Sequence, residues 1–327
     1  DLAPLIVEAL ARQGARIEVW RDADSGAGGL GQTLQINVVR TPVVAAGVWS
    51  LGAEYANAGQ PAPNGYAAVS GRFHRTDYSF GANLYSFRRR LPGHRTLTAG
   101  DGRNLGHVID DSPRAYVQYA ANGELAHDAW GGRLTAKLGM SHSLYADRSQ
   151  SRDVDTAGRL TGRAANPYSE GKDALEVGLS FDHPLFGGEL KLAALATRKG
   201  FDSAIVSTST APDGTLWARY AQDIHHDASE DIVRATYTRN LGRHRAEFGV
   251  ESAVNSLDAG ADVSLDLGGG PFPLHIPNAN IRIVEHRAEF HAGDAWTLRP
   301  GWSLESRLAW ETSRLDFSGD TTSRVRL

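Results

Sequence analysis

Cysteine is absent from this 327-residue chain, and so are several other features that mark common protein classes. Without cysteine the chain has neither disulfide bonds nor a thiolate nucleophile. No apolar run approaches the roughly 18–20 residues of a membrane-spanning helix. The formal charge of −4 argues against a general nucleic-acid-binding protein, which would carry a clustered basic face. We therefore expect neither a nucleic-acid partner nor a bound cofactor.

The sequence does contain long segments in which polar and apolar residues alternate. Arg133, Thr135 and Lys137 are interleaved with Leu134, Ala136 and Leu138, and the pattern returns at 284–292 and 304–311. A two-residue period sends successive side chains to opposite faces of a sheet. Several segments reach twelve or more residues, whereas strands of soluble proteins have a mode of about 5–6. The pattern therefore predicts an all-β protein, a transmembrane antiparallel β-barrel.

We predict eleven strands, with long and short connections in alternation. The long connections cover roughly 92–112, 148–170, 199–228 and 257–279, and shorter turns join the strands at the opposite end. This asymmetry is typical of outer-membrane barrels. The predicted strands are 43–55, 65–75, 78–91, 114–121, 132–147, 174–181, 189–198, 232–240, 244–255, 281–292 and 302–315.

The cost of charge in lipid predicts which face of each strand points inward. An arginine or lysine facing lipid near the midplane costs about 2–4 kcal/mol. The basic residues of the strands share the polar face, which we therefore place in the lumen, where charges on neighbouring strands pair; these residues are Arg133, Lys137, Arg245, Arg287 and Arg307. Aromatic residues near predicted strand ends indicate girdles at the two lipid interfaces: Tyr55, Phe73, Tyr78, Phe87, Tyr145, Trp296 and Trp302.

The first forty residues differ in pattern from the rest of the chain. The spacing of apolar residues predicts a helix at 4–12, and short strands follow at 17–20 and 34–38. Arg16–Arg21, a glycine-rich stretch at 28–31 and the segment 36–40 together resemble the end of the plug domain of TonB-dependent outer-membrane receptors. Asp22 and Ala23 replace the glycine-proline that usually follows the arginine in that family.

The resemblance implies a 22-strand barrel occluded by a plug. On this basis residues 1–41 are the C-terminal part of a small α/β plug domain, and residues 42–327 are the N-terminal half of the barrel, with about 11 of 22 strands. We expect the chain to be an internal piece of a longer protein, with 320–327 as a polar loop. Four plug residues are expected to contact the barrel wall: Arg16, Glu18, Arg21 and Arg40.

Such receptors import scarce ligands across the bacterial outer membrane. The resemblance implies a ferric siderophore, otherwise cobalamin or a saccharide, and a TonB energy-coupling complex that pulls on an N-terminal segment. We expect no enzymatic activity. A passive porin or channel is the main alternative, although it would not need the helix–strand–glycine–strand opening. A soluble β-rich binding protein is a further alternative.

Candidate ligand-binding residues lie in the predicted loops and at their edges. Arg88, Arg89 and Arg90, with His94 nearby, suit an anionic ligand or a lipopolysaccharide phosphate, unless they form only a solvated strand end. Rings in the later loops suit stacking on a ligand; the candidates there are Trp217, Tyr220, His225, Phe272 and His275.

A hydrolytic or metal site is a separate hypothesis for the loop around 225. His225 and His226, with Asp223 and Asp227, supply the groups of an acid–base pair or a metal site, as in a barrel-borne hydrolase. Adjacent residues of an extended segment point in opposite directions, however, so both histidines cannot easily face one ion. We favour solvated loop polarity and predict no metal site.

Overall fold

The computed structural model describes residues 16–21, 34–39, 45–57, 59–320 and 323–326. Two short strands near the start, β1 (Arg16–Arg21) and β2 (Leu34–Val39), pair antiparallel with each other. The strands predicted at 17–20 and 34–38 are thereby confirmed. The predicted helix at 4–12 and Arg40 lie outside the described residues. Arg16, Glu18 and Arg21 lie in β1, and their contacts with the barrel wall stay a prediction.

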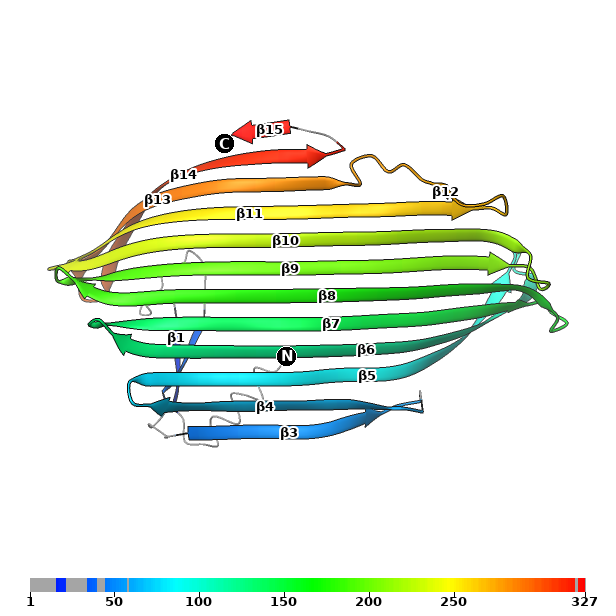
Figure 1. Ribbon diagram of the computed structural model, residues 1–327, viewed down its shortest axis with the longest axis horizontal. Coiled ribbons are helices and arrows are strands. Elements are labelled where there is room, and N and C mark those ends of the chain that lie inside the picture. Colours follow the sequence, from blue (N-terminus) through cyan, green and yellow to red (C-terminus); the bar gives the residue numbers. More distant parts are fainter. Residues whose placement is uncertain (1–15, 22–33, 40–44, 58, 321–322, 327) are drawn as a thin grey trace.

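The described residues contain no helix, so no helix among them could cross a membrane. The remaining strands form one antiparallel sheet in which each long strand pairs with the next one along the chain, as Figure 1 shows. The long strands are β3 (Ala45–Tyr55), β4 (Pro61–Phe73), β5 (Thr76–Thr98), β6 (Asn104–Ala129), β7 (Gly132–Val154), β8 (Leu160–Leu185), β9 (Gly188–Thr210), β10 (Leu216–Leu241), β11 (His244–Asp266), β13 (Ile281–Arg299) and β14 (Trp302–Gly319).

Two short strands complete the sheet. β12 (Phe272–Pro273) pairs with β11, and β15 (Ser323–Arg326) pairs with β14. The prediction of a polar loop over 320–327 is therefore wrong, because four of its eight residues form β15. Among the described residues β3 and β15 are the two edges, so the sheet is open.

All eleven predicted strands are present, but the predicted long loops are mostly wrong. β5, β7, β9 and β11 each run for 23 residues, and β6, β8 and β10 for 26. The strands continue through 92–112, 148–170 and 199–228 and meet at turns covering 99–103, 155–159 and 211–215. The connection predicted at 257–279 begins only after Asp266.

Two-residue turns join the strands at the other end, which we call the turn end; the opposite end is the loop end. The turns lie at 74–75, 130–131, 186–187, 242–243 and 300–301. In two of them both residues have positive φ: Trp130 and Gly131 at 50° and 74°, Phe186 and Gly187 at 48° and 74°. This type I′ geometry matches the twist of the flanking strands and fixes the register of the hairpins.

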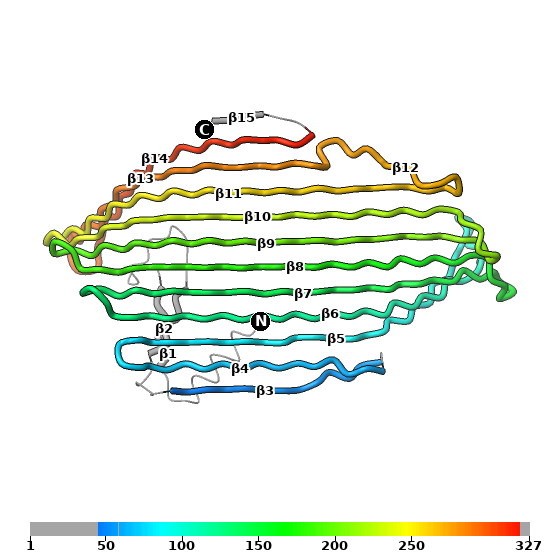
Figure 2. The backbone as a smooth tube through the Cα atoms, viewed as in Figure 1, coloured from blue at the N-terminus to red at the C-terminus, as the bar shows by residue number. Residues whose placement is uncertain are grey.

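Successive hairpins are displaced along the strand direction by a constant amount. Thr76, the first residue of β5, faces His127, two residues before the end of β6. Arg133, the second residue of β7, faces Asp182, three residues before the end of β8, and the same shift recurs between β9 and β10. The displacement is thus two residues per hairpin. Figure 2 shows that the staggered strands form a sheet that curves away at both ends.

Candidate functional site

The register assigns the side chains of the long strands to two faces. The charged face holds Arg133 and the residues in register with it, and the banded face holds Leu134 and the residues in register with it. All five cations predicted for the polar face lie on the charged face, and the predicted cross-strand pairing is confirmed for four of them; Arg245 forms no ion pair with a described residue. These pairs are Arg133 with Asp128, Lys137 with Glu124, Arg287 with Glu251, and Arg307 with Glu289.

Ion pairs on the charged face join into networks that cross several strands. Near the turn end Arg133 contacts both Asp77 and Asp128, and Arg72 lies 3.5 and 3.6 Å from the same two carboxylates. This network ties β4, β5, β6 and β7 together. Within this network each charge has an opposite charge beside it.

Glu251 on β11 is the most enclosed acid of the charged face. Its side chain is 7% exposed, and it bonds Arg234 of β10 on one side and Arg287 of β13, at 2.8 Å, on the other. Removing Glu251 would leave two arginines on neighbouring strands without an acidic partner.

The banded face carries an apolar band beside the turn end. On β8 the band lies between His183 and Asp173, ten residues apart, and on β9 Arg198 lies ten residues from Gly188 at the turn end. The large apolar side chains in the band remain exposed, with Leu179 at 50% and Leu308 at 77%. A continuous exposed apolar surface across most strands of a sheet is not typical of a monomer in water.

Exposed aromatic side chains gather at the turn end. Phe73, Trp130, Phe186 and Trp302 are 60–81% exposed there, and Trp296 is 40% exposed. The predicted girdle is therefore supported at this end, for Phe73, Trp296 and Trp302. For Phe87 and Tyr145 the prediction is wrong, because both lie in mid-strand and on the charged face.

Those two residues belong instead to a five-membered aromatic cluster on β5 to β8, formed by Tyr85, Phe87, Tyr116, Tyr145 and Tyr168. Phe87 and Tyr116 stack at 5.5 Å between ring centroids with 21° between planes. Tyr85 lies 6.0 Å from Tyr116, and Tyr145 lies 6.0 Å from Tyr168. Tyr116 faces Tyr145 in the register, which joins the two groups. The cluster offers ring faces and hydroxyl groups to a ligand on the charged face.

The basic run at 88–90 lies within β5, so its predicted position at the end of a strand is wrong, because the strand continues to Thr98. Strand alternation divides it between the faces. Arg89 is on the charged face, with its Nε 2.9 Å from Glu54 Oε1 and its guanidinium 5.0 Å from the centroid of Phe87. Arg88 and Arg90 are on the banded face. The run is therefore not one site, and only Arg89 adjoins the aromatic cluster.

The banded-face members of the run have partners of their own. Arg90 Nε donates to Asp111 Oδ1 at 2.6 Å, and this bond holds the pKa of Asp111 below its usual value. Arg88 donates to the side-chain oxygen of Gln60. The His94 ring lies 4.9 Å from that of His107 on β6.

The later candidates are also mostly in strands. Trp217, Tyr220 and His225 lie in β10 and Phe272 in β12, so their predicted loop positions are wrong; His275 does lie in a connection. Tyr220 is on the charged face and donates to Gln222 at 2.7 Å, whereas His225 is on the banded face. The register does not bring these residues into one site.

The histidine pair at 225–226 behaves as strand geometry predicts. His225, Asp223 and Asp227 point to the banded face, while His226 points to the charged face, 5.8 Å from the Phe201 ring. The expectation that the two histidines cannot face one ion is confirmed. Among the described residues no group of three or more His, Asp or Glu side chains is placed to hold a metal ion.

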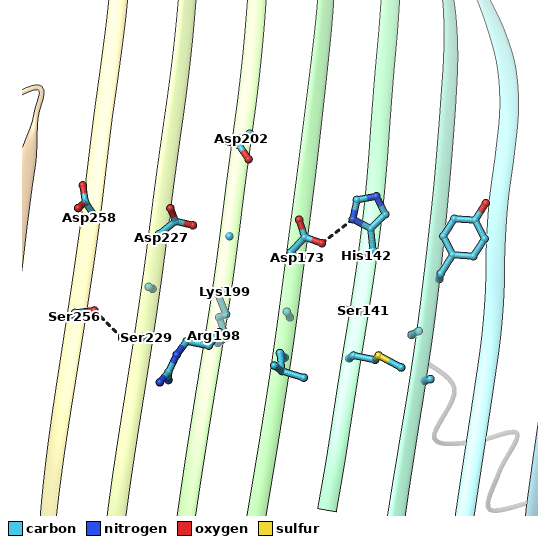
Figure 3. A pocket seen from close by; sticks show the side chains of 18 of the residues that line it. Ser141, His142, Asp173, Arg198, Lys199, Asp202, Asp227, Ser229, Ser256 and Asp258 are labelled. Atoms are coloured by element: carbon cyan, nitrogen blue, oxygen red, sulfur yellow. Dashed lines mark hydrogen bonds and ion pairs between the residues drawn. The ribbon is translucent and has the colours of Figure 1, made fainter.

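A hollow of about 870 Å³ lies on the banded face at the loop-end edge of the apolar band (Figure 3). His142 Nδ1 lies 2.7 Å from Asp173 Oδ1 at one side of it. Figure 3 shows Asp202, Asp227 and Asp258 on successive strands beside this pair. Sequence reasoning missed this aspartate hollow, because its lining residues come from seven strands and become neighbours only through the register. Met140 and Leu175 of the band also line it, so the hollow is amphipathic.

No family model and no curated protein matches this chain. Among solved structures, the Pseudomonas putida toluene transporter TodX aligns with 84% of this chain and 77% of its own, at 8% identity and a TM-score of 0.29. A similarity this low carries no argument about fold or function. The functional proposal therefore rests on the geometry described above.

Proposed function

We propose that this chain is part of an outer-membrane β-barrel receptor that imports a scarce ligand. The charged face would line the lumen and the banded face would contact lipid. The observation that carries this proposal is the apolar band, which is confined to one face of a single antiparallel sheet and begins beside two-residue turns. Two-residue turns at one end of long tilted strands are typical of outer-membrane barrels.

The stagger of the hairpins supports the proposal quantitatively. Two residues per hairpin is one residue per strand. A rise of about 3.4 Å per residue against a strand spacing of about 4.8 Å gives a tilt of about 35°, within the range of such barrels. The ten residues from His183 to Asp173 then span about 28 Å along the membrane normal. This height lies between the roughly 25 Å apolar band of known barrels and the roughly 30 Å hydrocarbon core.

The distribution of charge supports the orientation. Arg133, Lys137 and Arg287 lie on the charged face at the level of the band, and each has an acidic partner on an adjacent strand. In lipid each unpaired cation would cost about 2–4 kcal/mol near the midplane. Pointing this face toward the lumen removes that cost and leaves the apolar band to the lipid.

We infer TonB dependence from the resemblance of the first forty residues to the end of a plug. The antiparallel pair of β1 and β2 precedes β3, as the end of a plug would precede the barrel, with residues 1–41 assigned to the plug. A ferric siderophore is the ligand class we favour, otherwise cobalamin or a saccharide. The partners would be the TonB complex, that ligand and outer-membrane lipid. The aromatic cluster is the ligand-contact surface we favour, because its rings lie on the charged face toward the loop end.

Growth under ligand limitation tests this function with the full-length protein. A strain lacking the gene is complemented and offered ferric siderophores, cobalamin or oligosaccharides, with and without a functional TonB complex. We expect rescue by one ligand class only when the complex works. Rescue without the complex would indicate a passive channel, and absence of the full-length protein from the outer membrane would overturn the barrel itself.

A further inference from the structure

Beyond the loop-end edge of the apolar band, the banded face divides into a basic region and an acidic region. The basic region lies on β5 to β8, and its arginines are Arg88, Arg90, Arg148, Arg152 and Arg163. The acidic region lies on β8 to β11, and its aspartates are Asp173, Asp202, Asp223, Asp227, Asp258 and Asp262. All of these side chains are exposed. The two regions therefore present opposite charge side by side on one surface.

The acidic region places like charges directly opposite each other on adjacent strands. Asp223 of β10 faces Asp262 of β11, and Asp227 of β10 faces Asp258 of β11. No described residue forms an ion pair or a hydrogen bond with any of these four side chains. Like charges in this position destabilise a sheet, so the region favours a cationic partner.

The basic region repeats this arrangement with the opposite sign. Arg152 of β7 faces Arg163 of β8 in the register. Asp111 lines the same hollow, bonds Arg90 and interacts with Arg152. One acid thus serves a region that holds five arginines. The basic region therefore keeps a net positive charge next to the net negative charge of the acidic region.

The proposed orientation of the sheet sets the height of these groups above the membrane. At a tilt of about 35°, each residue along a strand adds about 2.8 Å of height, and so does each step to the next strand along a row of facing residues. Relative to Asp173 at the edge of the band, Arg90 and Asp227 lie about 8 and 6 Å higher, and Arg148 and Asp223 about 14 and 17 Å higher. The headgroup layer is only about 5–8 Å thick on each side of the hydrocarbon core. Arg148 and Asp223 therefore lie in water beyond the headgroups.

The same geometry makes the two regions complementary to each other in a second copy of the chain. Two copies inserted in the same direction are related by a two-fold axis parallel to the membrane normal, and such an axis exchanges left and right at constant height. Arg90 matches Asp227 in height, and Arg148 matches Asp223. With the sheet treated as flat, the midpoints of these two pairs coincide to within about 2 Å along the membrane plane. One axis therefore brings both arginines of one copy to aspartates of the other.

We propose that the chain forms a two-fold symmetric dimer in which the basic region of each copy contacts the acidic region of the other. The inference rests on the proposed function, which sets the direction of the membrane normal. The two regions together cover roughly 32 Å by 25 Å, which is close to the 800 Å² or so that each partner contributes to a standard protein interface. A second copy fits better than an unrelated partner, because a single axis satisfies two separate charge pairs. The attraction weakens as salt is added, since these charges are exposed.

Sedimentation equilibrium of the full-length protein in neutral detergent micelles measures the dimerisation. Two test variants reverse the charge of the facing groups: R90D/R148D in the basic region and D223R/D227R in the acidic region. The matched control is E305R/E311R, which reverses two exposed acids on the charged face of β14. We expect the wild type and the control to dimerise, and each test variant to associate at least roughly tenfold more weakly, because like charges then face each other. An equal mixture of the two test variants should dimerise again, since one is acidic in both regions and the other is basic in both.

Several outcomes would overturn the dimer. Test variants that dimerise as tightly as the wild type would show that these charges do not form the contact. Weak association of the test variants without recovery in the mixture would show that the two regions do not face each other. A wild type that is monomeric but is stabilised against thermal unfolding by added Ca²⁺ or lipopolysaccharide would assign the regions to ions or lipid instead. Failure of the wild type to insert into vesicles would count against the proposed function, whereas insertion as a monomer would count against this inference alone.

Discussion

Leu179 gives the sharpest test of whether the banded face lies in lipid. It lies on β8, four residues from His183 and six from Asp173, which at a tilt of about 35° places it about 11 and 17 Å from the two edges of the band. Its in-register neighbours are Ala136 and Ala194, which offer no acid to an introduced cation. In lipid, Leu179→Arg should therefore cost about 2–4 kcal/mol of folding free energy.

In water the same substitution would be nearly neutral. The Leu179 side chain is already 50% exposed, and surface substitutions away from special features usually change stability by less than about 0.5 kcal/mol. Two controls fix the interpretation. Met140→Arg lies on the same face, two residues from His142, between the uncharged Ala121 and Leu175, and should cost at most about 1 kcal/mol. Ser180→Arg lies on the charged face, two residues from Asp182, and should cost less than Leu179→Arg.

The assay is urea unfolding of the full-length protein folded into vesicles, with the slope of free energy against urea checked for each variant. We expect Leu179→Arg to cause the largest loss, and Met140→Arg and Ser180→Arg to cause smaller ones. Equal losses at Leu179 and Ser180 would refute the assignment of the two faces. A loss at Leu179 below about 0.5 kcal/mol would place the banded face in water.

Further predictions concern the charged face and the loop end. Glu251→Gln should lower the free energy of unfolding by about 2 kcal/mol, because two arginines lose their acidic partner; this value lies between those of buried and exposed ion pairs. Urea unfolding measures the loss. The control is Glu176→Gln, which changes an exposed acid on the same face. Tyr116→Ala should weaken ligand binding roughly tenfold by opening the aromatic cluster. Tyr119→Ala changes a residue on the banded face and should leave binding unchanged. Equal effects of the two substitutions in a binding titration would contradict a role for the cluster. The backbone N–H of the β7–β8 turn holds the pKa of Asp155 below its usual value. The stability that Asp155 gives this turn is therefore present at neutral pH and is lost only as the pH falls below about 4. The rate at which an added protease cleaves the turn should be constant from pH 7 to 5. Asp155→Asn should raise that cleavage rate at pH 7.

The sequence predicted the number of long strands correctly, because polar and apolar residues alternate clearly in the part of each strand beside the turn end. In β7 the residues from Arg133 to Met140 alternate without a break, and the opposite face of the strand is apolar at every second position. A period of two is the direct consequence of strand geometry, so it can be recognised without knowing which strands pair with one another. Four of the five two-residue turns contain a glycine, which marks a turn between two such segments; the turn at 74–75 does not.

The loop-end half of each strand was missed because polarity exchanges faces part-way along. On β9 the apolar residues beside the turn end are Leu192 and Ala194 on the banded face, whereas those near the loop end are Phe201 and Ile205 on the charged face. The geometric period continues, but the hydrophobic pattern shifts by one residue. A reading of hydrophobicity alone interprets that shift as the end of a strand.

The candidate sites depend on register, which the sequence does not contain. Asp173, Asp202, Asp227 and Asp258 lie about thirty residues apart along the chain, yet they line one hollow. Conversely, residues 88–90 are consecutive and divide between two faces. Sequence proximity therefore misled for the basic run, and sequence distance concealed the aspartate hollow.

The exchange of polarity also constrains what lies against the charged face near the loop end. If the banded face leaves lipid at Asp173, its loop-end half meets water or headgroups, and its arginines and aspartates suit both. The charged face at that level carries apolar and aromatic side chains instead, including the aromatic cluster, in which Tyr85 is 44% exposed. An apolar wall around an open aqueous lumen would be unfavourable, because apolar surface is more stable when it is buried against another group than when it contacts water. On the proposed orientation this wall is therefore the surface that a plug or an incoming ligand covers, and the charged network beside the turn end is the surface that needs no cover.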